Sequence, residues 1–106
     1  MSNSSDTAIE AEIVAKGLAA PRVTPDRIAA LMARVQFQFH VVGTSTFCYA
    51  FLDAEFYLAA GHSACVSKEN FDAEIGQKIA KANVMKPASD KLWELEGYAL
   101  RARLGT

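Results

Sequence analysis

The sequence predicts an α+β domain in which a three-stranded antiparallel meander has two helices before it and two helices after it. Three observations predict this order. Apolar residues have helical spacing up to residue 34, they alternate with a period of two over 35–61, and they return to helical spacing over 68–104. The 106-residue chain has the size of one domain, and its 51% hydrophobic content can supply a core. We therefore expect a flexible tail over residues 1–5 and a single domain over residues 6–106.

Two short helices come first. Thr7 opens the first helix with the spacing of a capping box, and Gly17 can close it. Thr24 can cap a second helix, because a threonine hydroxyl accepts a hydrogen bond from the first helical turn. Pro25 suits the first position of this helix, which is expected to run to about Arg34.

The next three segments alternate in polarity as β-strands do. They cover residues 35–41, 46–52 and 56–61, and the short turns between them predict an antiparallel sheet in the order one-two-three. The middle strand is apolar on both sides, as expected for a central strand. Its two sides carry, in turn, aromatic and smaller apolar residues: Phe47, Tyr49 and Phe51 on one, and Cys48, Ala50 and Leu52 on the other.

Short helices can cover one face of such a sheet. If they cover the aromatic side, the other face exposes an apolar centre with a polar rim, as modest interfaces do. Its residues would be Gln36, Gln38, His40, Cys48, Ala50 and Leu52. A two-fold homodimer through this face is therefore expected. The alternative is that the first helix folds over the face and leaves a monomer.

Two further helices follow the sheet. Ser67 is the expected cap of a helix over about residues 68–85, and Pro87 with its neighbours ends it. The last helix begins at Ser89 and reaches about Leu104.

Composition narrows the classes of function. The net charge of -1 favours neither nucleic acid nor an anionic membrane as a partner. Cys48 and Cys65 make no disulfide scaffold and are expected to be free thiols, and His40 and His62 lack zinc-ligand spacing. We therefore expect no metal and no cofactor. No apolar run nears the ~20 residues of a membrane span, and the N-terminus lacks signal-peptide features, so a cytoplasmic protein is expected.

Three blocks of sequence surround the last two predicted helices. They read Gly61-x-Ser63-Ala64-Cys65-Val66, Asn70-Phe71-Asp72-x-Glu74-Ile75-Gly76 and Leu92-Trp93-x-Leu95-Glu96-Gly97-Tyr98-x-Leu100. In this order they resemble the gp forty-nine-like family of small bacteriophage and prophage proteins, over about residues 22–104. The resemblance implies a phage-borne protein with an accessory role in the host bacterial cytoplasm. It transfers no catalytic residues to this chain.

The polar residues of these blocks are the candidates for binding or interaction: His62, Ser63, Cys65, Asn70, Asp72, Glu96 and Tyr98. A cysteine near a histidine can form a nucleophile and base. Such pairs are recognised by geometry rather than by spacing, however. The favoured interpretation of the segment around His62 and Cys65 is therefore a turn held by hydrogen bonds from side chains to the backbone.

The last predicted helix carries three residues that could act in binding: Trp93, Glu96 and Tyr98. Glu96 falls inside the apolar arc of that helix, and a carboxylate facing a core must be paired. We expect Glu96 to be mostly buried and to pair with Arg103 or a backbone amide; a ligand-binding or acid/base role is the alternative. Trp93 and Tyr98 are candidate anchors for a partner, although the same arc favours a core position for Trp93.

The expected function is that of a non-enzymatic binding module acting on a host protein, in counter-defence or host takeover. A nucleic-acid-associated phage protein is the first alternative. The order of elements is similar to that of double-stranded RNA-binding domains, and a basic strip is formed by Lys78, Lys81, Lys86 and Lys91. Three acidic residues within 69–74 occupy the place where such domains need positive charge, so nucleic acid is not favoured. A small enzyme using the His62/Cys65 region is the second alternative.

Overall fold

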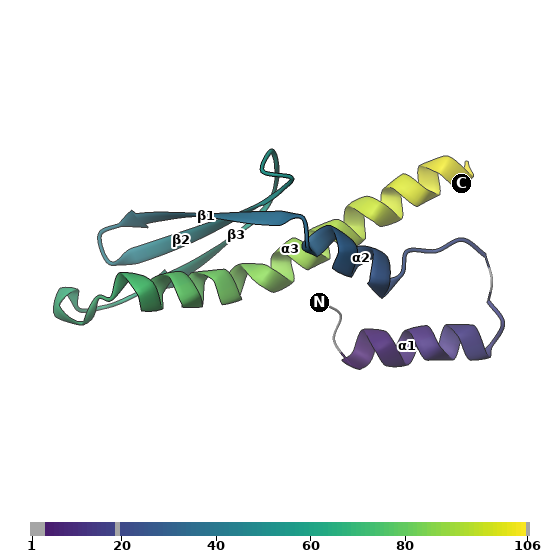
Figure 1. Cartoon of the computed structure of the whole chain (residues 1–106), viewed down its shortest axis with the longest axis horizontal. Coiled ribbons are helices and arrows are strands. Elements are labelled where there is room, and N and C mark those ends of the chain that lie inside the picture. The colour runs from purple at the N-terminus through teal and green to yellow at the C-terminus, as the bar shows by residue number, and fades with distance from the viewer. Residues whose placement is uncertain (1–3, 19, 106) are drawn as a thin grey trace.

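The fold is described by a computed structural model that covers residues 4–18 and 20–105. Its elements are α1 (Ser4–Ala15), α2 (Pro25–Met32), β1 (Val35–Val42), β2 (Ser45–Leu52), β3 (Phe56–Ala64), a short 3-10 turn (Lys68–Asn70) and α3 (Ala73–Leu104). The α+β class and the antiparallel meander β1-β2-β3 are confirmed. The described residues contain three α-helices rather than the predicted four, because one long helix replaces the predicted pair after the sheet (Figure 1).

The helix α3 continues through Pro87, where the sequence predicted a break. A proline inside a helix costs about 3 kcal/mol, because it removes one backbone donor and crowds the preceding turn. The compensation is a buried stripe with a spacing of four residues that extends on both sides of the proline. Its members are Ala80, Val84, Ala88 and Leu92. Pro87 itself lies on the exposed side, where water can bond the carbonyl group that the proline leaves without a donor.

Capping residues determine where α2 and α3 begin. Thr24 caps α2 as predicted, with its hydroxyl accepting from the Arg27 amide at 3.2 Å. The cap of α3 is Asp72 rather than Ser67, because the Asp72 carboxylate accepts from the Ile75 amide at 3.0 Å. The start of this helix is therefore later than predicted, and the 3-10 turn precedes it. The tail predicted for residues 1–5 lies partly outside the described residues, and α1 already includes Ser4.

The long helix α3 covers the side of the sheet that the predicted dimer required to be uncovered. The fully buried residues of β2 are Thr46, Cys48 and Ala50, which lie under α3, whereas the aromatic residues of β2 point to the other face. The cause is the close approach of the helix. A Cβ atom built on Gly61 of β3 would lie 2.4 Å from the Ala80 carbonyl oxygen, so only small side chains fit between β2 and α3.

The predicted self-association face is therefore wrong in its composition. Its residues divide between the two sides of the sheet: Gln36, Gln38 and His40 on the uncovered side, and Cys48, Ala50 and Leu52 on the side of α3. Because directly paired residues share a face, the cross-strand register defines the uncovered side. We call this side the open face, and its residues are Gln36, Gln38, His40, Phe47, Tyr49, Phe51, Tyr57, Ala60 and His62.

The core lies between the sheet, α2 and α3. Its fully or nearly buried members are Ile28, Leu31, Met32, Val35, Cys48, Ala50, Leu58, Ala80, Val84, Ala88 and Leu92. The first half of α3 runs along the sheet and its second half runs past α2, which gives the molecule an elongated outline of 57 × 27 × 19 Å (Figure 1). α1 lies beside α2, and an ion pair between Glu10 and Arg22 ties it to the segment before α2.

Candidate functional site

Two of the three sequence blocks meet at one place, where β3 leaves the sheet and α3 begins. They surround a pocket of about 170 Å³. We call it the signature pocket, and it is lined by Thr44, Thr46, Ser63, Ala64, Cys65, Asn70, Phe71, Asp72, Ile75, Gly76 and Ile79. The structure thus brings together four of the predicted site residues: Ser63, Cys65, Asn70 and Asp72.

Hydrogen bonds to the backbone hold the walls of the signature pocket. The Ser63 hydroxyl donates to the Gly76 carbonyl oxygen at 2.9 Å, which ties β3 to the first turn of α3. The Cys65 thiol donates to the Ser67 carbonyl oxygen at 3.2 Å. The Ser67 hydroxyl bonds the Glu69 carboxylate at 2.7 Å and is the main reason that the pKa of this carboxyl is lowered. Side-chain-to-backbone bonds are thus present at Ser63 and Cys65, but the Ser63 bond joins β3 to α3 rather than holding a turn.

One hydroxyl in this pocket has no partner. Thr46 is fully buried, and its Oγ1 atom makes no hydrogen bond within the described residues. It lies against Gly76, where a built Cβ would be 2.6 Å from Thr46 Oγ1, so the absence of a side chain at Gly76 makes the room for this hydroxyl. Burying a hydroxyl without a partner costs about 1–3 kcal/mol, so this position carries a cost in the free protein.

The replacement Thr46→Val tests the energetic cost of burying this hydroxyl, because valine keeps the shape of the side chain and removes the hydroxyl. We expect the free energy of unfolding to rise by about 1–2 kcal/mol, because an unpaired buried group is lost. Urea denaturation measures this, with Thr44→Val as the control at a half-buried position of the same pocket. A loss of stability in Thr46→Val would mean that the hydroxyl has a partner in the free protein.

His62 does not join the signature pocket. It lies on the open face, where its ring stacks on Phe47 with 4.9 Å between ring centroids. Ser63, next along β3, points to the side of α3, because successive residues of a strand alternate between faces. The described geometry therefore does not assemble His62 and Cys65 into a nucleophile–base pair.

Glu96 and Tyr98 lie far along α3 from this pocket. The Glu96 carboxylate is 27% exposed and accepts from Arg27 Nε at 2.8 Å. The expectation of a largely buried and paired carboxylate is thus confirmed, whereas the predicted partner was wrong. Arg27 of α2 takes this role rather than Arg103, because α2 packs against the second half of α3. Tyr98 is 73% exposed.

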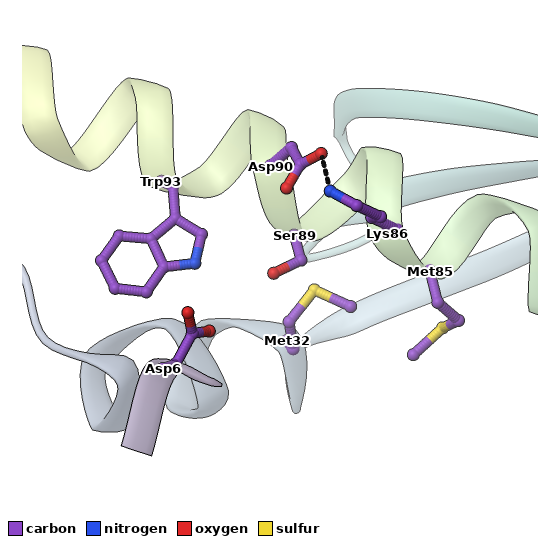
Figure 2. Close-up of a pocket in the computed structure, with 7 residues that line it drawn as sticks. All are labelled: Asp6, Met32, Met85, Lys86, Ser89, Asp90 and Trp93. Atoms are coloured by element: carbon purple, nitrogen blue, oxygen red, sulfur yellow. Dashed lines mark hydrogen bonds and ion pairs between the residues drawn. The ribbon is translucent and has the colours of Figure 1, made fainter. Parts of the chain in front are cut away.

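The larger hollow of about 560 Å³ lies between α1, α2 and α3 (Figure 2). Its lining residues are Asp6, Met32, Met85, Lys86, Ser89, Asp90 and Trp93. Trp93 faces this space and also packs against the core, as the sequence favoured. Lys86 and Asp90 form an ion pair at 2.9 Å on its rim. Trp93 is the one lining residue that belongs to the three sequence blocks, so this hollow is the weaker candidate.

Sequence reasoning missed Thr44, Thr46 and Gly76 as parts of the site. Gly76 stands in the second block, but nothing in the sequence shows which strand it faces. Thr46 alternates with Cys48 and Ala50, and this run of small side chains was the available signal for the side that a helix approaches closely. Both cysteines are free thiols in the described part of the chain, and burial raises the pKa of the Cys48 thiol.

Comparisons with known proteins agree with the sequence blocks. Residues 23–104 match the phage protein family described as N4 Gp49/phage Sf6 gene 66. The match spans most of the chain, so the chain belongs to this family, and the resemblance predicted over about 22–104 is confirmed. No curated protein and no solved structure gives a significant match. Over residues 4–18 and 20–105, no helix is long and apolar enough to cross a membrane, and no acidic, histidine and cysteine side chains gather as a metal site would require.

Proposed function

We propose that this member of the phage protein family is a non-enzymatic binding module that acts on a host component in the bacterial cytoplasm, and that the signature pocket is its binding site. The observation that carries the proposal is the unpartnered Thr46 hydroxyl in a pocket built from two family blocks. A buried hydroxyl without a partner among the described residues calls for an explanation, and a ligand that reached it would supply the missing hydrogen bond.

The pocket is suited to a small polar group rather than to a whole drug-sized molecule. Its volume of about 170 Å³ is below the range of about 300–1,000 Å³ that is typical of small-molecule sites. Its polar groups include the hydroxyls of Thr44 and Thr46 and the amide of Asn70, beside apolar walls from Ile75 and Ile79. Such a mixture supports recognition of one polar end of a host molecule, which is a side chain of a host protein or part of a free metabolite.

The experiment purifies tagged protein from phage-infected host cells and identifies what it retains by native mass spectrometry. Asn70→Ala alters the pocket, and Asn83→Ala makes the same change on α3 outside it. We expect wild type and Asn83→Ala to retain the same added mass, and Asn70→Ala to lose it. Retention by all three proteins, or by none, would contradict the signature pocket as the binding site.

A nucleic-acid role has less support, because much of the basic strip is engaged within the chain. Lys78 pairs with Glu74 at 3.5 Å, Lys86 pairs with Asp90, and Lys81 lies 4.8 Å from the centre of the Phe37 ring. A salt titration of duplex DNA and RNA binding tests this role, because phosphate contacts give a steep dependence on salt. The enzymatic alternative is tested by Cys65→Ser in an activity screen, and a loss of turnover in that variant would replace the present proposal.

A further inference from the structure

The signature pocket has the charge of a cation site, although it lies at the start of a helix. The positive end of the α3 dipole by itself favours an anion. Asp72 already places a carboxylate at this end, and among the described residues no lysine or arginine lines the pocket. The other polar side chains of the lining include hydroxyls and an amide, which can all accept hydrogen bonds. The pocket is therefore rich in acceptors and carries a negative charge.

Two oxygen atoms of the lining are not used by the protein itself. Asp72 Oδ1 accepts from the Ile75 amide at 3.0 Å, whereas Asp72 Oδ2 accepts from none of the described residues. Thr46 Oγ1 is fully buried and also lacks a partner within the described part of the chain. A hydroxyl can donate or accept, so Thr46 alone does not select the charge of a ligand. The carboxylate of Asp72 does select it, because it attracts a cation and repels an anion.

The chain around Asp72 adds to this preference. Three acidic residues lie within 69–74, against two lysines, Lys68 and Lys78. Lys78 is paired with Glu74 at 3.5 Å. The segment that forms this side of the pocket thus keeps a net negative charge, which raises the local concentration of cations.

The walls of the pocket are apolar and continue to the protein surface. Ile75 and Ile79 of α3 line the pocket and are 56% and 47% exposed, and Phe71 adds an aromatic ring to the lining. A volume of about 170 Å³ holds roughly five or six groups of the size of a water molecule, at about 30 Å³ each. The pocket therefore has room for one ammonium group with a stem of about four carbon atoms.

We infer that the polar group recognised by the signature pocket is a primary ammonium on a short apolar stem, with Asp72 as its counter-ion. The inference rests on the proposed function, because it specifies the ligand of the same site. The three donors of the ammonium can be shared among the Asp72 carboxylate and the hydroxyls of the pocket. The stem packs on Ile75 and Ile79, as lysine stems pack on apolar surfaces. A lysine side chain of a host protein and a free alkylamine share this chemistry.

The test is two-dimensional amide NMR of the full labelled chain, titrated with three probes that have the same number of non-hydrogen atoms. The probes are n-butylammonium, n-butanol and propionate. We expect n-butylammonium to shift the amide signals of Thr46, Ser63 and residues 72–76 in a saturable way. Its dissociation constant should be at least about tenfold lower than those of the neutral and anionic probes, because charge-assisted hydrogen bonds are the stronger ones.

Asp72→Asn is the variant, because asparagine caps a helix as well as aspartate does but carries no charge. Asp26→Asn makes the same change in the first turn of α2, outside the signature pocket, and is the control. We expect Asp72→Asn to weaken n-butylammonium binding at least about tenfold, since a hydrogen bond to a charged group is lost. Asp26→Asn should leave it within about twofold, because distant exposed charges are screened.

A capped tripeptide with lysine between two glycines separates the two sources of the ammonium. Shifts of the same amides, with binding at least as tight as that of n-butylammonium, identify a lysine of a host protein. Exclusion of the peptide from a pocket that accepts n-butylammonium identifies a free amine.

Three results would overturn the inference. Equal or tighter binding of n-butanol or propionate means that the positive charge is not recognised. Equal affinity of the two variants for n-butylammonium means that Asp72 is not its counter-ion. No shift at the pocket with n-butylammonium at high millimolar concentration rejects the ammonium itself. The proposed function is judged separately, because retention of a host component that depends on Asn70 would then indicate another class of ligand at the same site.

Discussion

Gly61→Ala is expected to lower the free energy of unfolding by about 3 kcal/mol, at the upper end of the cost of overpacking. An added Cβ would lie 2.4 Å from the Ala80 carbonyl oxygen and 2.5 Å from the Val84 amide nitrogen. Both atoms belong to the backbone of α3, which cannot rotate away as a flexible side chain does. The methyl group would therefore push the helix off the sheet or distort β3.

Gly97→Ala is the matched control, because nothing lies within 4 Å of a Cβ built on Gly97. This change sits in the same long helix that Gly61 contacts, and it is expected to stabilise the protein by up to about 1 kcal/mol through helix propensity. Urea denaturation curves compare the two variants. Equal midpoints would show that α3 does not approach β3 as closely as described.

Leu92→Ala should lower the free energy of unfolding by a similar amount, about 3 kcal/mol. Leu92 is 2% exposed and belongs to the core together with Ile28 and Leu31 of α2. Truncating it leaves a cavity between α2 and the part of α3 that follows Pro87. The change therefore tests whether that part of the helix is docked as firmly as the part under the sheet.

Leu95→Ala provides the comparison on the same helix, since Leu95 is 37% exposed. Its truncation is expected to cost less than about 1.5 kcal/mol, because less apolar area returns to water. If the two variants had the same midpoint in urea, the second half of α3 would not pack on α2 in solution.

Local sequence signals predicted the sheet well. Alternation over 35–61 depends only on neighbouring residues, and short turns such as the one at Gly43 leave few ways to connect antiparallel strands. The cap of α2 at Thr24 was likewise a local property. These elements were predicted because the residues that determine them are adjacent in the chain.

The errors concern long-range packing. Pro87 is a local signal for a break, but burial of Ala88 and Leu92 beyond it overrides that signal. The predicted dimer also depended on the condition that helices cover the aromatic side of the sheet. The distance between α3 and the sheet determines which side the helix covers. This distance depends on the contact of Gly61 with residues of α3 that lie far along the chain.

The same division between local signals and long-range packing applies to the candidate site. The sequence selected Ser63, Cys65, Asn70 and Asp72 because they stood in recognisable blocks, and the structure places them around one pocket. It could not separate His62 from them without the strand register, although His62 is next to Ser63 in the chain. Thr46 was not selected, because its burial without a partner is a property of the packed structure alone.

Two-dimensional amide NMR of the labelled protein, titrated separately with the small-molecule fraction and the protein fraction of host lysate, tests the proposed binding site most directly. Binding at the signature pocket should shift the amide signals of Thr44, Thr46 and Ser63 and those of residues 70–76. The lysate fraction that causes these shifts identifies the host component as a small molecule or as a protein. Shifts confined to the open face or to the hollow beside Trp93, with the signature pocket unchanged, would contradict the account.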